Sequence, residues 1–395
     1  MFYLAVDQHH KQLTISLRNE AGEVAQRRQV STQPARIREF LQQVQDRAAA
    51  DGGYVVMLEV CGFNDWLLRL LREYECRHIA LIQPEKQSKK KTDRRDANAL
   101  GELLWVNRQR LLAGQKIQGV RQVEIVSEAD LDDRRLTAIR HRLGQQRTRT
   151  VNRIHRILRR HNLEWERPTK TFDTQAMRRW LSSLALPEGD RVEMDQLLAQ
   201  WRLWDDQLRQ LEERIQQRCE ANPVAQTLMT IIGVSYFAAL ALASRINDIA
   251  RFPRARSLAN YFGLTPGCRN SGDATDRLGS ITKQGSAIAR FILGQLVMHV
   301  LKHDGQMRTW YQRIKRRRGA KIARVAVMRR LATILWHMVK HQQAYQYQRV
   351  PRARAEQSLS TFDVESAHRH QAEVLAQLGI RAAIPEAAVA ATATE

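Results

Sequence analysis

The first 83 residues combine short apolar strands with amphipathic helices in an order that restricts the possible folds. Strands are predicted where apolar residues cluster or alternate, at residues 2–6, 12–17, 23–30, 54–58 and 78–82. Amphipathic helices are predicted at residues 35–48 and 64–74. Three strands followed by helix, strand, helix and strand indicate an α/β domain built on a mixed sheet.

This element order is typical of an RNase H-like α/β domain, and the remaining sequence is mostly helical in pattern. A chain of 395 residues is long enough for two domains with connecting helices. We therefore expect α/β plus α architecture. The expected parts are an α/β domain at 1–106, an arginine-rich helical connector at 107–222, a mainly helical domain at 223–345 and a mostly disordered tail at 346–395.

Four acidic residues occupy positions where carboxylates are unusual. Asp7 and Glu59 follow predicted strands, and Asp93 and Asp96 stand three residues apart at the start of a helix predicted to run through Leu104. Taken singly, each has an ordinary explanation. It is either a polar loop residue or an acid at the start of a helix, where it interacts favourably with the positive end of the helix dipole. Together they predict a carboxylate cage for Mg²⁺, in which two ions about 4 Å apart would hold a phosphate.

The formal net charge of +23 predicts a polyanionic partner, because basic residues on phosphates release condensed counterions. A membrane surface is the competing partner. No apolar run approaches the roughly 20 residues that span a bilayer, and no signal peptide opens the chain, so no membrane partner is expected.

Residues 134–160 carry ten arginines and no acid on a predicted helix. Such a run is usually a solvated helix face, but uncompensated charges would repel one another, which favours a bound nucleic acid. The contacts would follow the phosphate backbone and carry no base specificity. The expected nucleic-acid-binding residues here are Arg135, Arg142, Arg149, Arg153, Arg156 and Arg160.

A second basic run, residues 308–330, holds ten basic residues and no acid, with Trp310 and Tyr311 near its start. Arg316, Arg317 and Arg318 are the expected binding residues. Aromatic residues interleaved with basic residues are suited to binding single strands or RNA, whose bases are able to stack on the aromatic rings. A surface helix with a buried tryptophan is the alternative.

Apolar residues between Met194 and Ile215 step by alternating threes and fours, which predicts a heptad seam. This coiled-coil segment would pair either with the arginine-rich helix of the same chain or with another protomer. The sequence does not decide between these two arrangements.

The segment from Leu264 to Gly285 places one serine, Ser271, among glycines, with Arg269 and Lys283 nearby. Glycines allow positive φ and close backbone approach. A serine hydroxyl beside these cations is able to attack a phosphodiester whose charge they neutralise. A polar surface loop between two helices is the alternative interpretation.

The four cysteines are scattered and match neither a zinc site nor a disulfide framework. A reducing compartment is the simplest expectation, and we expect a cytoplasmic, nucleoid-associated bacterial protein.

Residues 1–340 resemble the DEDD-type insertion-sequence transposases related to the Piv DNA invertase, whose members include recombinases guided by a bridge RNA. The resemblance is strongest at Lys91-Thr-Asp93-Arg-Arg-Asp96-Ala97 and at Gly263-Leu-Thr-Pro266 with Ser271-Gly272 and Gly279-Ser-Ile-Thr-Lys283-Gln-Gly285.

The resemblance implies that a RuvC-like N-terminal domain holds Mg²⁺ on Asp7, Glu59, Asp93 and Asp96. It further implies that Ser271 of a C-terminal transposase domain attacks DNA and forms a covalent phosphoserine. The partners would be donor and target DNA, a structured guide RNA and other protomers in a dimer or tetramer, with the acids and the serine contributed by different protomers.

Two other functions remain open at this point. In a metal-dependent nuclease of RNase H or resolvase type, water would attack the phosphate and Ser271 would be structural. In a non-catalytic nucleic-acid-binding protein, the four acids would be ordinary helix caps and loop residues.

Overall fold

The computed structural model describes residues 1–83, 93–268 and 278–346, and its chain forms two compact units, Met1–Ile125 and Val126–Glu395. The expected tail at 346–395 lies almost entirely outside the described residues. Within the described ranges, no helix combines the length and the apolar character that are needed to cross a membrane. Three of the cysteines, Cys61, Cys76 and Cys219, are free thiols.

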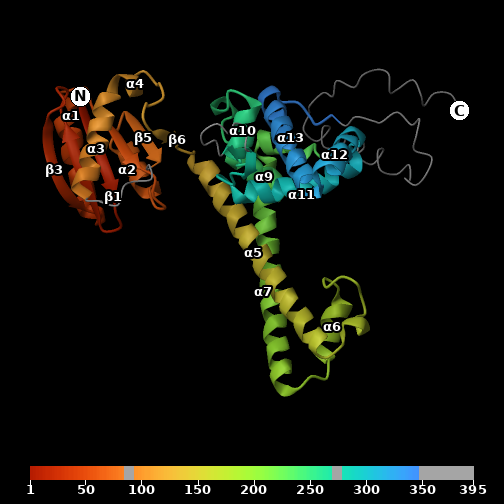
Figure 1. Ribbon diagram of the computed structural model, residues 1–395. Helices are drawn as coiled ribbons and strands as arrows, with labels where there is room; N and C mark the ends of the chain where they lie inside the picture. The colour runs from red at the N-terminus through yellow and green to blue at the C-terminus, as the bar shows by residue number, and fades with distance from the viewer. Residues whose placement is uncertain (84–92, 269–277, 347–395) are drawn as a thin grey trace. The chain divides into compact units, whose positions relative to one another are not determined.

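The first unit is built on one mixed sheet with the strand order β3-β2-β1-β4-β5-β6 (Figure 1). Its strands are β1 (Phe2–Gln8), β2 (Gln12–Arg18), β3 (Val24–Ser31), β4 (Tyr54–Glu59), β5 (His78–Gln83) and β6 (Arg121–Val123). β1, β2 and β3 form an antiparallel meander, β4 and β5 are parallel to β1, and β6 is antiparallel to β5. The expected mixed α/β sheet is confirmed.

Helices cover both faces of this sheet, as the alternation of its buried side chains requires. The helices of this unit are α1 (Pro34–Ala49), α2 (Asp65–Glu73), α3 (Asp93–Val106) and α4 (Arg108–Leu112). On one face, Phe40 and Leu41 of α1 and Leu71 of α2 join the core. On the other face, Leu100 and Leu104 of α3 pack against residues of β1 and β4.

The first unit extends past the boundary expected at residue 106. Leu111 of α4 and Ile117 are buried in the same core as α3, and β6 pairs with β5. The chain therefore leaves this unit only after Ile125. β6 was not predicted, because a strand of three residues with two polar side chains carries no periodic signal.

The second unit begins with long helices that lie side by side (Figure 1). These elements are α5 (Glu128–Arg160), the short helix η1 (Glu164–Glu166), α6 (Gln175–Ser183) and α7 (Glu188–Glu220). Residues of the predicted heptad seam, including Met194, Leu197 and Trp201, are buried in a core shared with Ile154 and Ile157 of α5. The choice left open by the sequence is thus answered: α7 pairs with the arginine-rich helix of its own chain.

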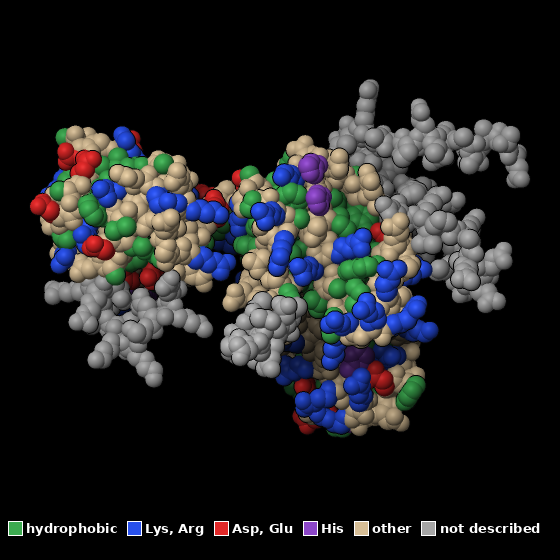
Figure 2. Space-filling model, turned by 45° about the horizontal axis from the view of Figure 1, so that its top comes forward, with side chains coloured by type: hydrophobic (Ala, Val, Ile, Leu, Met, Phe, Trp, Pro, Cys, Tyr) green, Lys and Arg blue, Asp and Glu red, His purple; other side chains and the backbone are tan. Residues whose placement is uncertain are grey.

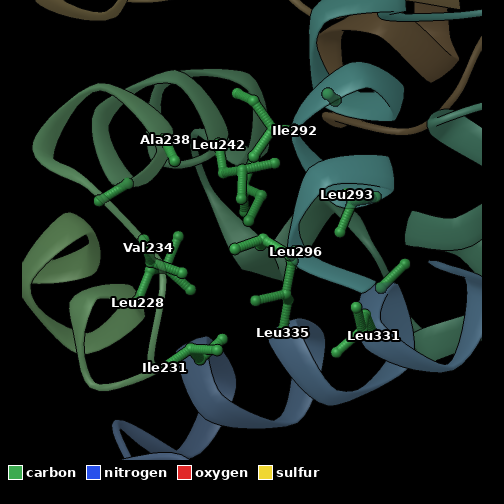
Figure 3. Packing of buried hydrophobic residues seen from close by; sticks show 14 of the residues in the cluster. Leu228, Ile231, Val234, Ala238, Leu242, Ile292, Leu293, Leu296, Leu331 and Leu335 are labelled. Carbon is green, nitrogen blue, oxygen red and sulfur yellow. The ribbon is translucent and has the colours of Figure 1, made fainter. Parts of the chain in front are cut away.

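The rest of the second unit is a helical domain with one short hairpin. Its elements are α8 (Pro223–Met229), α9 (Tyr236–Ile246), η2 (Ile249–Arg251), α10 (Ala255–Tyr261), β7 (Pro266–Cys268), β8 (Leu278–Ile281), α11 (Ala287–His303), α12 (Gly305–Arg318) and α13 (Ala320–His341). Leu242 of α9, Leu296 of α11 and Leu335 of α13 meet in its core (Figure 3). The expectation of a mostly helical C-terminal part is confirmed.

Several of these helices start on a side-chain cap. The hydroxyls of Ser127, Ser235 and Ser286 and the carboxylate of Asp304 each accept a backbone N–H of the first turn. A cap of this kind stabilises a helix by about 1 kcal/mol. The caps fix where α5, α9, α11 and α12 begin, and therefore which residues face the core.

Candidate active site and nucleic-acid interface

Asp7 and Glu59 lie side by side at the ends of two neighbouring strands. β1 and β4 are parallel, and their register places Ala5 beside Met57. Continued by two residues along both strands, the same register places Asp7 beside Glu59. Because side chains alternate along a strand, Asp7 shares the face of Ala5 and Glu59 shares the face of Met57, which is the face that α3 covers. Two of the four expected acids thus meet on one face of the sheet.

The direction of α3 follows from contacts near its C-terminal end. A side-chain atom added to Gly101 would stand 3.2 Å from Ser16 Oγ, and Ser16 pairs with Ala5 of β1. One residue later, Glu102 accepts a hydrogen bond of 2.8 Å from Arg18. Since Arg18 pairs with Tyr3, α3 runs antiparallel to β1.

The first turn of α3 therefore starts at the end of the sheet where Asp7 lies. Ala97 lies about 6 Å from Gly101 along the α3 axis, toward the start of the helix. Asp7 lies about 6.6 Å from Ala5 along β1, in the same direction, so the two distances nearly match. Asp93 and Asp96 stand in this first turn. Their side chains lie outside the described residues.

One buried hydroxyl at this end of the sheet has no partner in the described part of the protein. Thr14 lies opposite Asp7 in the β1–β2 register and is 4% exposed. Its Oγ1 makes no hydrogen bond with any described residue. A buried polar atom of this kind usually contacts water or a ligand.

This donor set fits a hard cation such as Mg²⁺, which prefers carboxylate oxygens and retains bound water. Asp7 and Glu59 supply two carboxylates, and Thr14 adds a hydroxyl beside them. Within residues 1–83, 93–268 and 278–346, no group of three or more acidic, histidine or cysteine residues is placed to hold a metal. A complete Mg²⁺ site would therefore require Asp93 or Asp96 in addition.

Two buried amides, which the sequence did not reveal, hold the ends of β1 and β4 together. Asn64 Nδ2 donates to Gln8 Oε1 at 2.9 Å and to the backbone oxygen of Glu59 at 3.0 Å. Asn64 Oδ1 accepts the N–H of Cys61 at 2.6 Å, and Gln8 Nε2 donates to the oxygen of Phe63 at 3.1 Å. Gln8 and Asn64 thus position the backbone that carries both acids.

The segment that contains Ser271 is closed at its base by a hairpin. β7 and β8 pair antiparallel, with Pro266 opposite Ile281. Below them, Thr282 N donates to Thr265 O at 3.0 Å. Ser271 itself, like Arg269, lies outside the described residues, between the two strands of this hairpin.

Two glycines lock the base of the hairpin. Gly263 has φ +69° and Gly285 has φ +108°. A side-chain carbon on Gly263 would lie 2.1 Å from Gln284 O, and one on Gly285 would lie 2.0 Å from Tyr261 O. The close approach that glycine permits is made here to the protein's own backbone, so both positions require glycine.

Lys283 lies at this base and is exposed, as a residue that contacts a polyanion must be. Its φ is +54°, which is uncommon for a residue other than glycine. Its backbone N–H donates to Gly263 O at 3.2 Å. The left-handed backbone at Lys283 is therefore held by the same closure of the hairpin.

A buried arginine lies under the start of α11, next to this hairpin. Arg245 is 7% exposed, and its Nε donates to Ser286 Oγ at 3.0 Å. Its Nη1 donates to Thr137 Oγ1 at 3.1 Å and to Ala241 O at 2.8 Å. Burial, with a smaller contribution from Arg134, lowers the pKa of Arg245 to about 10. Among the described residues it makes no ion pair, so its positive charge remains uncompensated at the base of the serine segment. The sequence signal was an arginine inside an alanine-rich helix.

The arginine-rich helix α5 is partly neutralised by acids from other segments. Five of its ten arginines make ion pairs, and these pairs include Arg135–Asp132, Arg140–Glu212, Arg147–Asp205, Arg159–Glu164 and Arg160–Asp190. The expectation that these arginines lack counterions is therefore wrong for half of them, including Arg135 and Arg160. It failed because α7, which is distant in sequence, supplies Asp190, Asp205 and Glu212, and because Asp132 and Glu164 lie just outside the acid-free run.

The remaining candidates of α5 form one exposed face. Arg142, Arg149, Arg153 and Arg156 are spaced by seven, four and three residues and are all exposed. Within the described ranges none of them makes an ion pair. This face is the part of α5 that is available to a polyanion.

We predict different effects for arginines on the two faces of α5. Arg156→Gln is expected to make nucleic-acid binding less dependent on salt, with unchanged thermal stability. The slope of the logarithm of the binding constant against the logarithm of the salt concentration should decrease in magnitude by about one. Arg147→Gln is expected to destabilise the fold by about 2 kcal/mol, because Asp173 loses its contact with Arg147 and Asp205 keeps only Arg178. Fluorescence anisotropy over a salt series and thermal unfolding measure the two effects. Equal effects of both variants would contradict this division.

The second basic run surrounds the turn between α12 and α13. Lys315, Arg316, Arg317 and Arg318 are exposed at the C-terminal end of α12, and in the described structure none of them makes an ion pair. Lys and Arg side chains are prominent on the surface of the second unit (Figure 2). The guanidinium of Arg330 lies 4.9 Å from the ring of Trp310, so that aromatic side chain is engaged within the protein. This favours the buried-tryptophan alternative for Trp310, while Arg316–Arg318 form an exposed basic patch.

Comparison with known proteins finds matches to transposases in both units of the chain. A DEDD transposase family model of IS110 type matches residues 4–163, and the family described as "Transposase IS116/IS110/IS902 family" matches residues 225–312. The "Transposase for insertion sequence element IS1111A" of Coxiella burnetii is 28% identical over 313 residues, which are 77% of this chain and 82% of the relative. The "Probable family 20 transposase" of Pseudomonas aeruginosa is 24% identical over 321 residues, 79% of this chain and 89% of the relative.

These matches support DNA transposase activity for the chain, and residues 4–163 are similar to transposases of the DEDD type. Within that class, residues 4–163 and 225–312 are similar to insertion-sequence transposases of the IS110/IS116 family.

Proposed function

We propose that this transposase is a site-specific recombinase, which cuts and rejoins DNA through a covalent bond between Ser271 and a DNA phosphate. Asp7, Glu59, Asp93 and Asp96 would hold Mg²⁺ at that phosphate. The observation that carries the proposal is the strand register that brings Asp7 beside Glu59, with the first turn of α3 at the same end of the sheet.

The chemistry assigned to Ser271 is a nucleophilic displacement. Its Oγ forms a bond to phosphorus as the bond from phosphorus to one strand oxygen breaks, and that strand leaves as an alcohol. Attack by a second strand reverses the step and releases the serine, so no external energy source is needed. Mg²⁺, when bound, would stabilise the charge on the phosphate oxygens and on the departing oxygen.

The protein's own residues supply the electrostatic surroundings of this step. Gly263 and Gly285 fix the close backbone contacts at the base of the hairpin that carries the serine segment. Arg245 adds a buried positive charge at this base, and Lys283 adds an exposed one. Positive charge arranged in advance favours a transition state in which negative charge builds up on phosphate oxygens.

The two basic surfaces support a second polyanion in addition to the DNA that is cut. One is the exposed face of α5 and the other is the Arg316–Arg318 patch on α12. We propose a structured guide RNA as this partner, and a dimer or tetramer in which the carboxylates of one protomer act with Ser271 of another.

The experiment that tests the proposed function is a trapping assay on DNA that carries the ends of the element. Wild-type protein is incubated with labelled DNA and Mg²⁺, and the mixture is resolved under denaturing conditions. We expect a protein–DNA adduct that is lost in Ser271→Ala and lost again when the metal is chelated.

Other results would contradict the proposal in recognisable ways. Cleavage without an adduct, unaffected by Ser271→Ala, would identify a metal-dependent nuclease in which water attacks. Binding with neither cleavage nor adduct would identify a nucleic-acid-binding protein without catalytic activity.

A further inference from the structure

The helices α5 and α7 line an open surface cavity, and its residues are distant in sequence from those of the proposed reaction. Its volume is about 430 Å³, within the range of small-ligand sites. Its lining includes one tryptophan, two arginines and three side-chain amides, namely Trp204, Arg149, Arg153, Gln146, Asn152 and Gln200.

Trp204 is held in a fixed position at this cavity. It is half-buried, and its indole N–H donates to Thr150 Oγ1 at 3.2 Å. Because its only polar atom is engaged by α5, the ring atoms that remain for the cavity are apolar carbons. A flat apolar ring at a polar, basic site is suited to stacking against a base.

Arg149 and Arg153 add positive charge on one side of the same cavity. They stand one helical turn apart on the exposed face of α5 and make no ion pair within the described ranges. Among the described residues, no acidic side chain lines the cavity. The contrast is with Arg147, on another face of α5, which pairs with Asp205 at 2.6 Å. Two such arginines are suited to contacts with phosphates.

The side-chain amides provide both hydrogen-bond donors and hydrogen-bond acceptors. Gln146, Asn152 and Gln200 each carry donors and an acceptor, which match the mixed edges of nucleobases. A fully paired duplex cannot offer a base face to Trp204, because its bases are stacked on one another. An unpaired nucleotide offers a base face, a base edge and a phosphate together.

We propose that this cavity binds one unpaired nucleotide of the polynucleotide partner, with the base against Trp204 and its phosphates at Arg149 and Arg153. The proposal rests on the proposed function only in requiring a polynucleotide partner. DNA and RNA share the recognised chemistry, and separate binding measurements distinguish them.

The test uses the full-length protein, freed of nucleic acid at high salt. Anisotropy measures its affinity for a labelled 12-nucleotide single strand, as DNA and as RNA, and for the same sequence as a duplex. Trp204→Ala is expected to weaken single-strand binding about tenfold and duplex binding less than twofold. Trp204→Phe, which keeps an aromatic ring, should retain most of the single-strand affinity.

Trp165→Ala is the matched control, because Trp165 is 88% exposed and lies outside the cavity. It should leave all affinities unchanged. A second measurement needs no variant: a single strand containing 5-iodouracil is photocrosslinked to the wild-type protein. The tryptic peptide from Leu203 to Arg209, which contains Trp204, should then carry the nucleotide.

An unchanged single-strand affinity in Trp204→Ala, or an equal loss for single strand and duplex, would overturn the proposal, as would a crosslink confined to other peptides. Such results would leave the proposed recombinase intact. Failure of the wild-type protein to bind any polynucleotide would overturn both proposals together.

Discussion

Asp7→Asn is expected to lower the rate of DNA strand cleavage roughly 1,000-fold, which corresponds to about 4 kcal/mol of transition-state stabilisation. The change removes one carboxylate charge at the end of β1 and keeps the size of the side chain. DNA affinity should stay within about twofold, because the exposed arginines of α5 and α12 provide the contacts to phosphates. Cleavage of labelled DNA and anisotropy measure the two quantities.

Asp51→Asn is the control for this experiment. Asp51 is exposed in the turn before β4 and belongs to the same unit, so its replacement removes the same charge without touching the carboxylates at the sheet end. It should cleave at the wild-type rate. Asp93→Ala and Asp96→Ala are expected to behave like Asp7→Asn. Normal cleavage by Asp7→Asn, or a loss of binding that parallels the loss of cleavage, would exclude the metal role of this residue.

Gly285→Ala is the second change with a large expected effect. The added carbon would lie 2.0 Å from Tyr261 O, and the residue has φ +108°, a conformation that an alanine rarely adopts. The backbone must shift at the base of the serine hairpin, at an expected cost of about 3 kcal/mol. We expect a lower unfolding temperature and a loss of adduct formation, with the fold of the first unit unchanged.

Gly267→Ala supplies the comparison within the same hairpin. Among the described residues, a side-chain carbon there would meet only Ser280 O, at an ordinary contact distance of 3.7 Å. Its unfolding temperature should stay close to that of the wild type. If Gly267→Ala and Gly285→Ala were equally stable and equally active, the rigid closure at Gly285 would have no role in presenting Ser271.

The sequence was sufficient to predict β1 to β5 of the sheet and the mostly helical C-terminal part, because their signals are local. Apolar alternation located β1, β2 and β4 to within two residues, and the ends of those strands located Asp7 and Glu59. The pairing of α7 with α5 needed the structure, because a heptad seam indicates that a helix has a partner without identifying it.

The parts that the sequence missed depend on contacts between distant residues. Asn64 marked only the start of a helix in the sequence, but it bonds to Gln8, 56 positions earlier. Arg140 lacked an acid nearby in the sequence, and its partner Glu212 is 72 residues away. Spacing within one segment carries no information about such pairs.

The reaction assigned to Ser271 is tested most directly by locating the DNA on the peptide. The trapped adduct is digested with nuclease and trypsin, which cuts after Arg269 and Arg277 and releases the peptide from Asn270 to Arg277. Mass spectrometry should find a nucleotide joined through phosphate to Ser271. Cleaved DNA together with an unmodified peptide would show that the serine does not attack, and would contradict the account.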